Sequence, residues 1–210
     1  MQHRLTTHAR RLARLALLAA ALALPACNKT IRMGVPPGVT ADEARRLMNA
    51  ERLSLEASKL ETSDRPAAID KYKQAVLEYR EYTQAWNNLG RLLMEEGQYL
   101  QAAEAFSTAA DLSPEDPRPC YNLGLLYDRR GYLREARDYY ERAIDRESNY
   151  LPALRGAIRA DALLNEGSTQ TLDWLARALM LERDARWLEW MRLQKARIEN
   201  LPTIRALTGI

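Results

Sequence analysis

Histidine and cysteine are scarce in this chain of 210 residues, which has two of each. Both histidines, His3 and His8, lie within the segment 1–26, so the segment 27–210 contains no imidazole. The commonest general base and a common metal ligand are therefore missing from that part of the chain. Of the two cysteines, Cys120 is interpreted as a core thiol, because free cysteine is among the most buried residue types. We expect neither a metal ion nor a cofactor.

Catalytic signatures are missing as well. The 28 aspartates and glutamates form no recognisable catalytic pair, and the sequence has neither a glycine-rich phosphate loop nor a serine nucleophile elbow. No segment alternates apolar and polar residues as a strand would, whereas almost everything from residue 41 onward has a helical period. The sequence predicts an all-α domain that is not an enzyme.

The N-terminal segment, residues 1–26, has the three parts of an export signal. Four arginines and no acidic residue come first, an apolar run from Leu15 to Leu24 follows, and small residues lead up to Cys27. The apolar run is too short to cross a bilayer, which needs about 20 apolar residues. A cleaved secretory signal over residues 1–26 fits better than a transmembrane helix.

The end of this segment reads Leu24-Pro25-Ala26-Cys27 and resembles the lipobox of a bacterial lipoprotein signal. The resemblance implies cleavage before Cys27, a diacylglycerol on its thiol and a third acyl chain on its amine, which together would anchor the chain stably. A lipidated Cys27 could not form a disulfide with Cys120. The alternative is a plain secretory signal with a cysteine near its cleavage site by chance.

The location that follows is the bacterial cell envelope. By resemblance to the sorting of Gram-negative lipoproteins, Asn28 after the anchor favours the outer membrane, with the chain facing the periplasm. The positive charge of the whole chain comes from the four leader arginines, since residues 27–210 carry 27 basic and 28 acidic side chains. Nothing in this balance indicates nucleic-acid binding.

The boundary of the helical domain is marked by a change in composition. Residues 27–40 are interpreted as the lipidated cysteine and a flexible linker, because residues 28–39 contain two prolines and two glycines and no helical period. Thr40 and Glu43 have the spacing of a capping box, in which each side chain bonds to the backbone N–H of the other residue. The predicted helical domain therefore spans residues 41–210.

An internal repeat is the most informative feature of this domain. Two copies, residues 83–116 and 117–150, place small, aromatic and turn-forming residues at matching positions. The first copy has Trp86, Leu89, Gly90, Leu93, Gly97, Tyr99, Ala102, Phe106, Ala109 and Pro114. The second copy has Cys120, Leu123, Gly124, Tyr127, Gly131, Ala136, Tyr140 and Ala143. The pattern and its period resemble the tetratricopeptide repeat, which is a pair of antiparallel helices.

This resemblance implies a right-handed superhelical solenoid, in which each helix pair needs neighbours to bury its apolar face. Gly97 and Gly131 are expected to form the turns within the pairs. Gly90 and Gly124 are expected where two helices cross, leaving room for alanines of the partner helix.

The flanks carry the repeat in a weaker form. Residues 49–82 and 151–184 keep the helix pair but lose several of the repeat's typical residues, which is usual for terminal repeats. The chain would thus have about four repeats. A last helix, from about Asp184 to Asn200 within the segment 184–210, is expected to cap the solenoid.

The resemblance also implies where a partner would bind, because in this family the first helices of successive repeats line a concave groove. The side chains predicted to face it are Gln84, Asn87, Asn88, Arg91, Arg118, Tyr121, Asn122, Arg155 and Arg159. Arginine and amide groups suit the carbonyls and carboxylates of an extended or acidic peptide. The position at which some relatives bind a C-terminal carboxylate through lysine is Leu53 here, so that mode is not expected. An ordinary solvated helix face is the alternative.

Three tryptophans, Trp174, Trp187 and Trp190, form a second candidate site. They could dock a partner, since tryptophan is enriched at interface hot spots, or simply close the end of the solenoid. The function that the sequence favours is a membrane-tethered scaffold of the cell envelope that binds a protein or peptide, whose identity stays open. A structural spacer and an accessory subunit of an envelope enzyme are the alternatives.

Overall fold

The computed structural model describes residues 40–208, with side chains as far as Asn200. The predicted leader, the lipidation site Cys27 and the linker from Asn28 to Val39 lie outside the described residues. The regular elements of residues 40–208 are all α-helices, which confirms the predicted all-α class. None of these helices is long and apolar enough to cross a membrane.

The chain falls into two units that divide after Arg46. In the first unit, the predicted capping box is present. The backbone N–H of Glu43 donates to Thr40 Oγ1 at 3.1 Å, and the backbone N–H of Thr40 donates to Glu43 Oε2 at 2.8 Å. The first described helix accordingly begins at Ala41.

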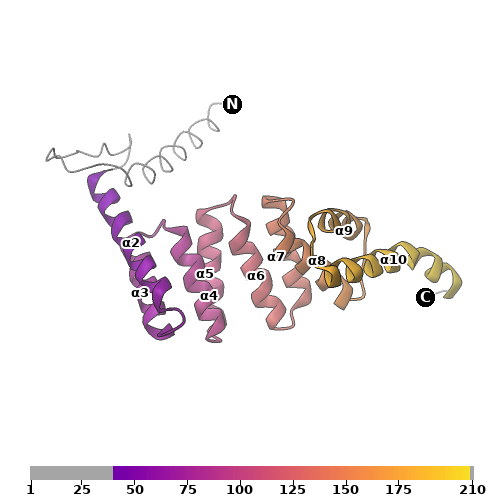
Figure 1. Cartoon of the computed structure of the whole chain (residues 1–210), viewed down its shortest axis with the longest axis horizontal. Coiled ribbons are helices and arrows are strands. Elements are labelled where there is room, and N and C mark those ends of the chain that lie inside the picture. Colours follow the sequence, from indigo (N-terminus) through magenta and orange to yellow (C-terminus); the bar gives the residue numbers. More distant parts are fainter. Residues whose placement is uncertain (1–39, 209–210) are drawn as a thin grey trace, which may run out of the picture. The chain divides into compact units, whose positions relative to one another are not determined.

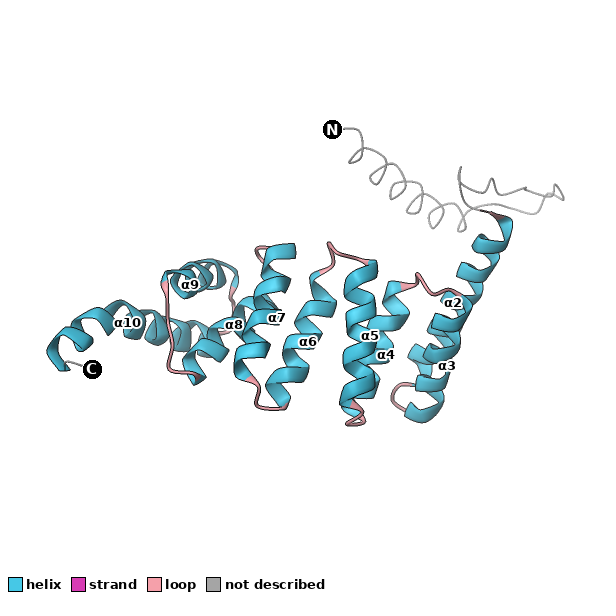
Figure 2. Ribbon diagram, turned by 180° about the vertical axis from the view of Figure 1, so that it is seen from behind, coloured by secondary structure: helices cyan, strands magenta, loops and turns pink. Residues whose placement is uncertain are grey.

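The helices of residues 40–208 are α2 (Ala41–Leu60), α3 (Arg65–Glu78), α4 (Thr83–Glu95), α5 (Tyr99–Leu112), α6 (Pro117–Arg129), α7 (Leu133–Arg146), α8 (Leu151–Leu163), α9 (Thr169–Leu181) and α10 (Ala185–Thr208). From α3 to α9, helices of 13 or 14 residues follow one another, joined by short connections, and the flanking helices α2 and α10 are longer (Figures 1 and 2). Each helix from α3 to α9 packs on the next one along the chain. The last helix is longer than expected, since it continues past Asn200 to Thr208.

Four buried aromatic side chains show how far the repeat extends. Tyr72, Phe106, Tyr140 and Trp174 follow one another at the regular spacing of the repeat, on α3, α5, α7 and α9. Each is at most 1% exposed. The second helix of every pair therefore fills the space between helices with one large ring, including the pairs whose sequence pattern is weak.

The helix crossings are tighter than the sequence suggested. A Cβ atom on Gly90 would lie 2.7 Å from the ring of Phe106, and one on Gly124 would lie 2.5 Å from the ring of Tyr140. These glycines thus make room for aromatic rings rather than for the alanines that we expected. Glycine is needed at both positions because any side chain would enter a ring of the neighbouring helix.

The turns inside the pairs use a left-handed backbone, as predicted for Gly97 (φ +74°) and Gly131 (φ +80°). At the corresponding position of the next pair, Asn165 adopts φ +56°. Asparagine is one of the few residues besides glycine that tolerates this conformation. The turn is therefore preserved where the glycine is not.

Candidate functional site

The residues predicted to line the groove lie on the first helices of three successive pairs. Asn87, Asn88 and Arg91 are on α4, Arg118, Tyr121 and Asn122 are on α6, and Arg155 and Arg159 are on α8. Asn122 Nδ2 donates to Asn87 Oδ1 at 2.8 Å. This hydrogen bond brings the predicted faces of α4 and α6 next to each other.

Arg91 is held by carboxylates of its own chain. Its Nη2 lies 2.5 Å from Glu61 Oε2 and its Nη1 lies 3.1 Å from Glu95 Oε1. Glu61 also accepts the phenolic proton of Tyr72 at 2.8 Å. Burial alone would lower the pKa of Arg91, but the two carboxylates outweigh it and raise the pKa. The charge of Arg91 is thus largely balanced inside the fold.

Arg118 is more open. Its Nε and Nη2 donate to Asp116 at 2.9 and 2.7 Å, and the side chain stays 56% exposed. Asp116 is the N-cap of α6 and also accepts the backbone N–H of Arg118. About one turn further along α6, the half-buried ring of Tyr121 meets that of Tyr150 edge-on, with the centroids 5.7 Å apart.

Arg155 is tied to the buried carboxylate of Glu182, which lies at the C-terminal end of α9. Its Nε and Nη2 each donate to that carboxylate at 2.6 Å. Burial would raise the pKa of Glu182, but the hydrogen bonds from Arg155 and from the backbone N–H groups of Asp184 and Arg183 outweigh it and lower the pKa. The guanidinium also lies over the ring of Trp187, 5.0 Å from its centroid. Arg155 therefore links α8 to the start of α10.

Arg159, one turn further along α8, pairs with Asp128 of α6. Asp128 in turn accepts the phenolic proton of Tyr140 at 3.2 Å. The arginines of the predicted groove thus all make ion pairs within the chain, and they differ in how much of the guanidinium stays open to a partner.

The predicted tryptophan cluster is divided in the structure. Trp174 is 1% exposed within α9 and lies under Arg137, whose guanidinium is 5.2 Å from the ring centroid. It belongs to the core and does not face a partner. Trp187 and Trp190 on α10 lie together, edge to face, with centroids 5.4 Å apart.

A cavity of about 650 Å³ opens beside these two rings. Its walls come from the C-terminal end of α8, the turn that follows, and the first half of α10. Among the lining residues are Arg159, Leu163, Arg186, Trp187, Trp190 and Arg197. We call this cavity the Trp–Arg pocket. Sequence reasoning identified its tryptophans and Arg159 separately but did not predict that they share a pocket.

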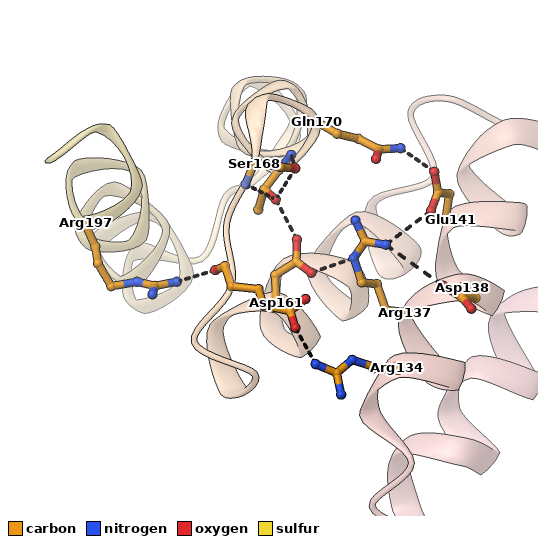
Figure 3. A network of polar contacts seen from close by, with 10 residues as sticks. Arg134, Arg137, Asp138, Glu141, Asp161, Ser168, Gln170 and Arg197 are labelled. Carbon is orange, nitrogen blue, oxygen red and sulfur yellow. Dashed lines mark hydrogen bonds and ion pairs between the residues drawn. The ribbon is translucent and has the colours of Figure 1, made fainter. Parts of the chain in front are cut away.

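The sequence also did not predict a polar network that joins α7, α8 and α9 (Figure 3). The buried Asp161 of α8 accepts Arg137 Nε of α7 at 2.6 Å and the Thr171 hydroxyl of α9 at 2.6 Å. Further out, Arg197 of α10 donates to the backbone oxygen of Glu166 at 2.9 Å. The one signal in the sequence was that Asp161 stands where the repeat usually has an aromatic residue, because a carboxylate at a core position requires partners.

Two further features bear on chemistry at the described residues, the carboxylate and thiol groups. Within residues 40–200, no group of three or more histidine, cysteine, aspartate and glutamate side chains could hold a metal ion. Cys120 is 3% exposed, and burial raises the pKa of its thiol. A buried thiol of this kind is less reactive than an exposed one, because the thiolate is the nucleophile.

Comparison with known families recognises the repeat. The family described as TPR repeat matches residues 90–131, and the family described as tetratricopeptide repeat matches residues 117–150. Residues 90–150 therefore carry tetratricopeptide repeats. Superkiller complex protein 3 of Homo sapiens is 26% identical over 100 residues, which is 45% of this chain and 6% of that protein. The chain thus spans a small fraction of this relative's length.

Two solved structures show the same fold. MamA 41-end from Desulfovibrio magneticus RS-1 is 19% identical, with a TM-score of 0.55 over 64% of this chain and 76% of that structure. The first TPR of Spaghetti (RPAP3), bound to the HSP90 peptide SRMEEVD, is 18% identical, with a TM-score of 0.54 over 57% of this chain and 96% of that structure. The predicted helical solenoid of tetratricopeptide type is confirmed.

Proposed function

We propose that this chain is a protein-interaction module that is held at a bacterial membrane through a lipid on Cys27 and binds a partner protein on the face made by α4, α6 and α8. The observation that carries the proposal is the alignment of this face. Asn87 of α4 and Asn122 of α6 are hydrogen-bonded to each other, and Arg118 and Tyr121 lie on the same helix as Asn122. A row of amide, guanidinium and phenol groups suits the backbone and carboxylates of an extended peptide.

The groove residues do not contribute equally in this proposal. Arg91 and Arg155 mainly join helix pairs, since their carboxylate partners Glu61 and Glu182 are 22% and 1% exposed at the side chain. Arg118 is 56% exposed and keeps free donor capacity. We therefore assign partner contact chiefly to Arg118 and Tyr121. The solved structure with a bound HSP90 peptide supports peptide binding as the mode for this type of fold.

The partner is tested by cross-linking in cells that produce the full chain, followed by purification and identification of captured proteins. The double variant Arg118→Ala, Tyr121→Ala should lose most of the captured partner. Its melting temperature is measured alongside, since Tyr121 also packs in the helix row. Gln101→Ala on the exposed side of α5 is the matched control and should capture normally. If neither the unchanged chain nor its variants capture a protein, the structural spacer is favoured.

The membrane tether is a separate part of the proposal. It rests on the arginine-rich leader, the short apolar run and the Leu24-Pro25-Ala26-Cys27 segment. We propose that residues 1–26 are removed, that Cys27 is lipidated, and that the module lies in the cell envelope, at the outer membrane of a Gram-negative cell. Labelled palmitate should be incorporated into the chain and into Cys120→Ser but not into Cys27→Ser. Label that persists in Cys27→Ser would disprove the anchor.

A further inference from the structure

Most of the wall of the Trp–Arg pocket is apolar surface. The pocket is a wide hollow that is largely open to solvent, with a volume of about 650 Å³. Trp187, Trp190 and Leu163 supply apolar surface, and the Leu163 side chain is exposed. A pocket of this size can receive one large apolar side chain together with its neighbours.

The aromatic wall is held in place before any ligand arrives. Arg155 lies over one face of Trp187 and is itself fixed by two hydrogen bonds of 2.6 Å to Glu182. Trp190 meets Trp187 edge-on, at an interplanar angle of 86°. Side chains that are already ordered lose little conformational entropy on binding, so such a wall favours affinity.

The charge of the lining has one sign. Arg159, Arg186 and Arg197 line the pocket, and no carboxylate belongs to the lining. Arg159 is balanced by Asp128, and Arg197 donates to Asn165 and to the backbone oxygen of Glu166. Arg186 is exposed at the start of α10, and within residues 40–200 its guanidinium makes no hydrogen bond or ion pair. The pocket is therefore complementary to a negative charge.

We propose that the Trp–Arg pocket binds an acidic segment of the partner protein in which an apolar side chain is flanked by carboxylates. The apolar side chain lies between Trp187, Trp190 and Leu163, and the flanking carboxylates meet Arg186 and the open side of Arg159. A small inorganic anion would leave the indole rings uncovered, and a purely apolar ligand would leave Arg186 without a partner. The inference rests on the proposed function only in assigning the segment to a protein partner.

Tryptophan fluorescence of the full chain tests this directly, because two of its four tryptophans line the pocket. The probe is a capped pentapeptide with a central leucine between two glutamates on each side. It should change the emission saturably, and the same peptide with a central serine should bind at least about tenfold more weakly, as expected when a hot-spot contact is lost.

Variants assign the signal to the pocket. Arg186→Gln should weaken binding of the leucine peptide about tenfold, as loss of an interfacial hot-spot arginine does. This change is on an exposed side chain without internal partners within residues 40–200, so the melting temperature should not move. The matched control is Arg192→Gln, an exposed arginine on the same helix that does not line the pocket and should bind normally.

Three results would overturn the inference: no saturable change up to millimolar peptide, equal binding of the serine peptide, or equal weakening by Arg192→Gln. The last two would reveal general attraction of anions, which inorganic phosphate would then displace as well. The cross-linking experiment separates this inference from the proposed function. A captured partner that Arg186→Gln does not reduce would leave the interaction module standing and refute the pocket. Peptide binding without any captured partner would support the pocket and refute the interaction module.

Discussion

Substituting Gly124 by alanine tests the tight crossing between α6 and α7. The new Cβ would lie 2.5 Å from both Cδ1 and Cε1 of Tyr140 and 3.1 Å from its Cγ. The ring is 1% exposed, so it cannot turn outward. On its other side it faces Gly156 of α8, where a Cβ would approach to 2.7 Å. The tyrosine is therefore enclosed between two glycines.

The expected cost follows from two opposing effects. Overpacking of this kind destabilises by about 1–3 kcal/mol, and the closed surroundings of Tyr140 favour the upper end. Alanine gains about 1 kcal/mol over glycine inside a helix. The free energy of unfolding of Gly124→Ala should thus fall by about 2 kcal/mol, although helix propensity alone would raise it.

Urea unfolding of the full chain, followed by far-ultraviolet circular dichroism, measures this change. Gly156→Ala should show a similar loss, and the double variant Gly124→Ala, Gly156→Ala should lose more than the sum, since each substitution removes the space into which the ring would move. Gly124→Ala combined with Tyr140→Leu should cost less than the two changes separately. A urea midpoint for Gly124→Ala at or above that of the unchanged chain would refute the tight packing of Gly124 against Tyr140.

Three further changes test other contacts. Asp161→Ala should lower the free energy of unfolding by about 1–3 kcal/mol, because the buried Thr171 hydroxyl and Arg137 Nε lose their acceptor, while Glu141 and Asp138 still balance the charge of Arg137. A loss below about 0.5 kcal/mol, typical of a surface site, would contradict this. Asn165→Ala should melt lower than Asn165→Gly, since a left-handed residue with a Cβ costs about 1–2 kcal/mol, and equal melting would contradict the turn. Hydrogen bonds from Arg155 and the backbone outweigh burial and lower the pKa of Glu182. The stability that the ionised Glu182 contributes is therefore present above its ordinary pKa of 4.5 and is lost as the pH falls through its lower folded pKa. Acid unfolding of Glu182→Gln should accordingly depend less on pH in that range, and an unchanged pH profile would be the contrary result.

The features that the sequence predicted correctly are local. A capping box such as Thr40 and Glu43 needs residues three apart, and a turn such as Gly97 needs one residue with a positive φ. The all-helical class follows from periodicity within single helices. Each of these depends on backbone conformation over a few residues, which the side chains in that stretch determine.

The contacts that the sequence did not predict join residues on different helices. The periodic pattern placed Gly124 at a crossing, but the neighbour that fills the space, Tyr140, depends on how α6 and α7 approach each other. In the same way, the sequence grouped Trp174 with Trp187 and Trp190 and left open whether the three dock a partner or close the end of the solenoid. The register of Trp174 with Tyr140, one repeat earlier in the chain, is what assigns it to the core.

The arginines give the clearest case, because their partners lie about one repeat away. Arg91 binds Glu61 across 30 residues, Arg155 binds Glu182 across 27, and Arg134 binds Glu166 across 32. An arginine on a first helix therefore does not by itself indicate a binding site, since a carboxylate on the neighbouring pair can already occupy it. Among the pocket arginines, Arg186 has no such carboxylate within residues 40–200, and for this reason a partner's acidic group would bind there without displacing an internal one.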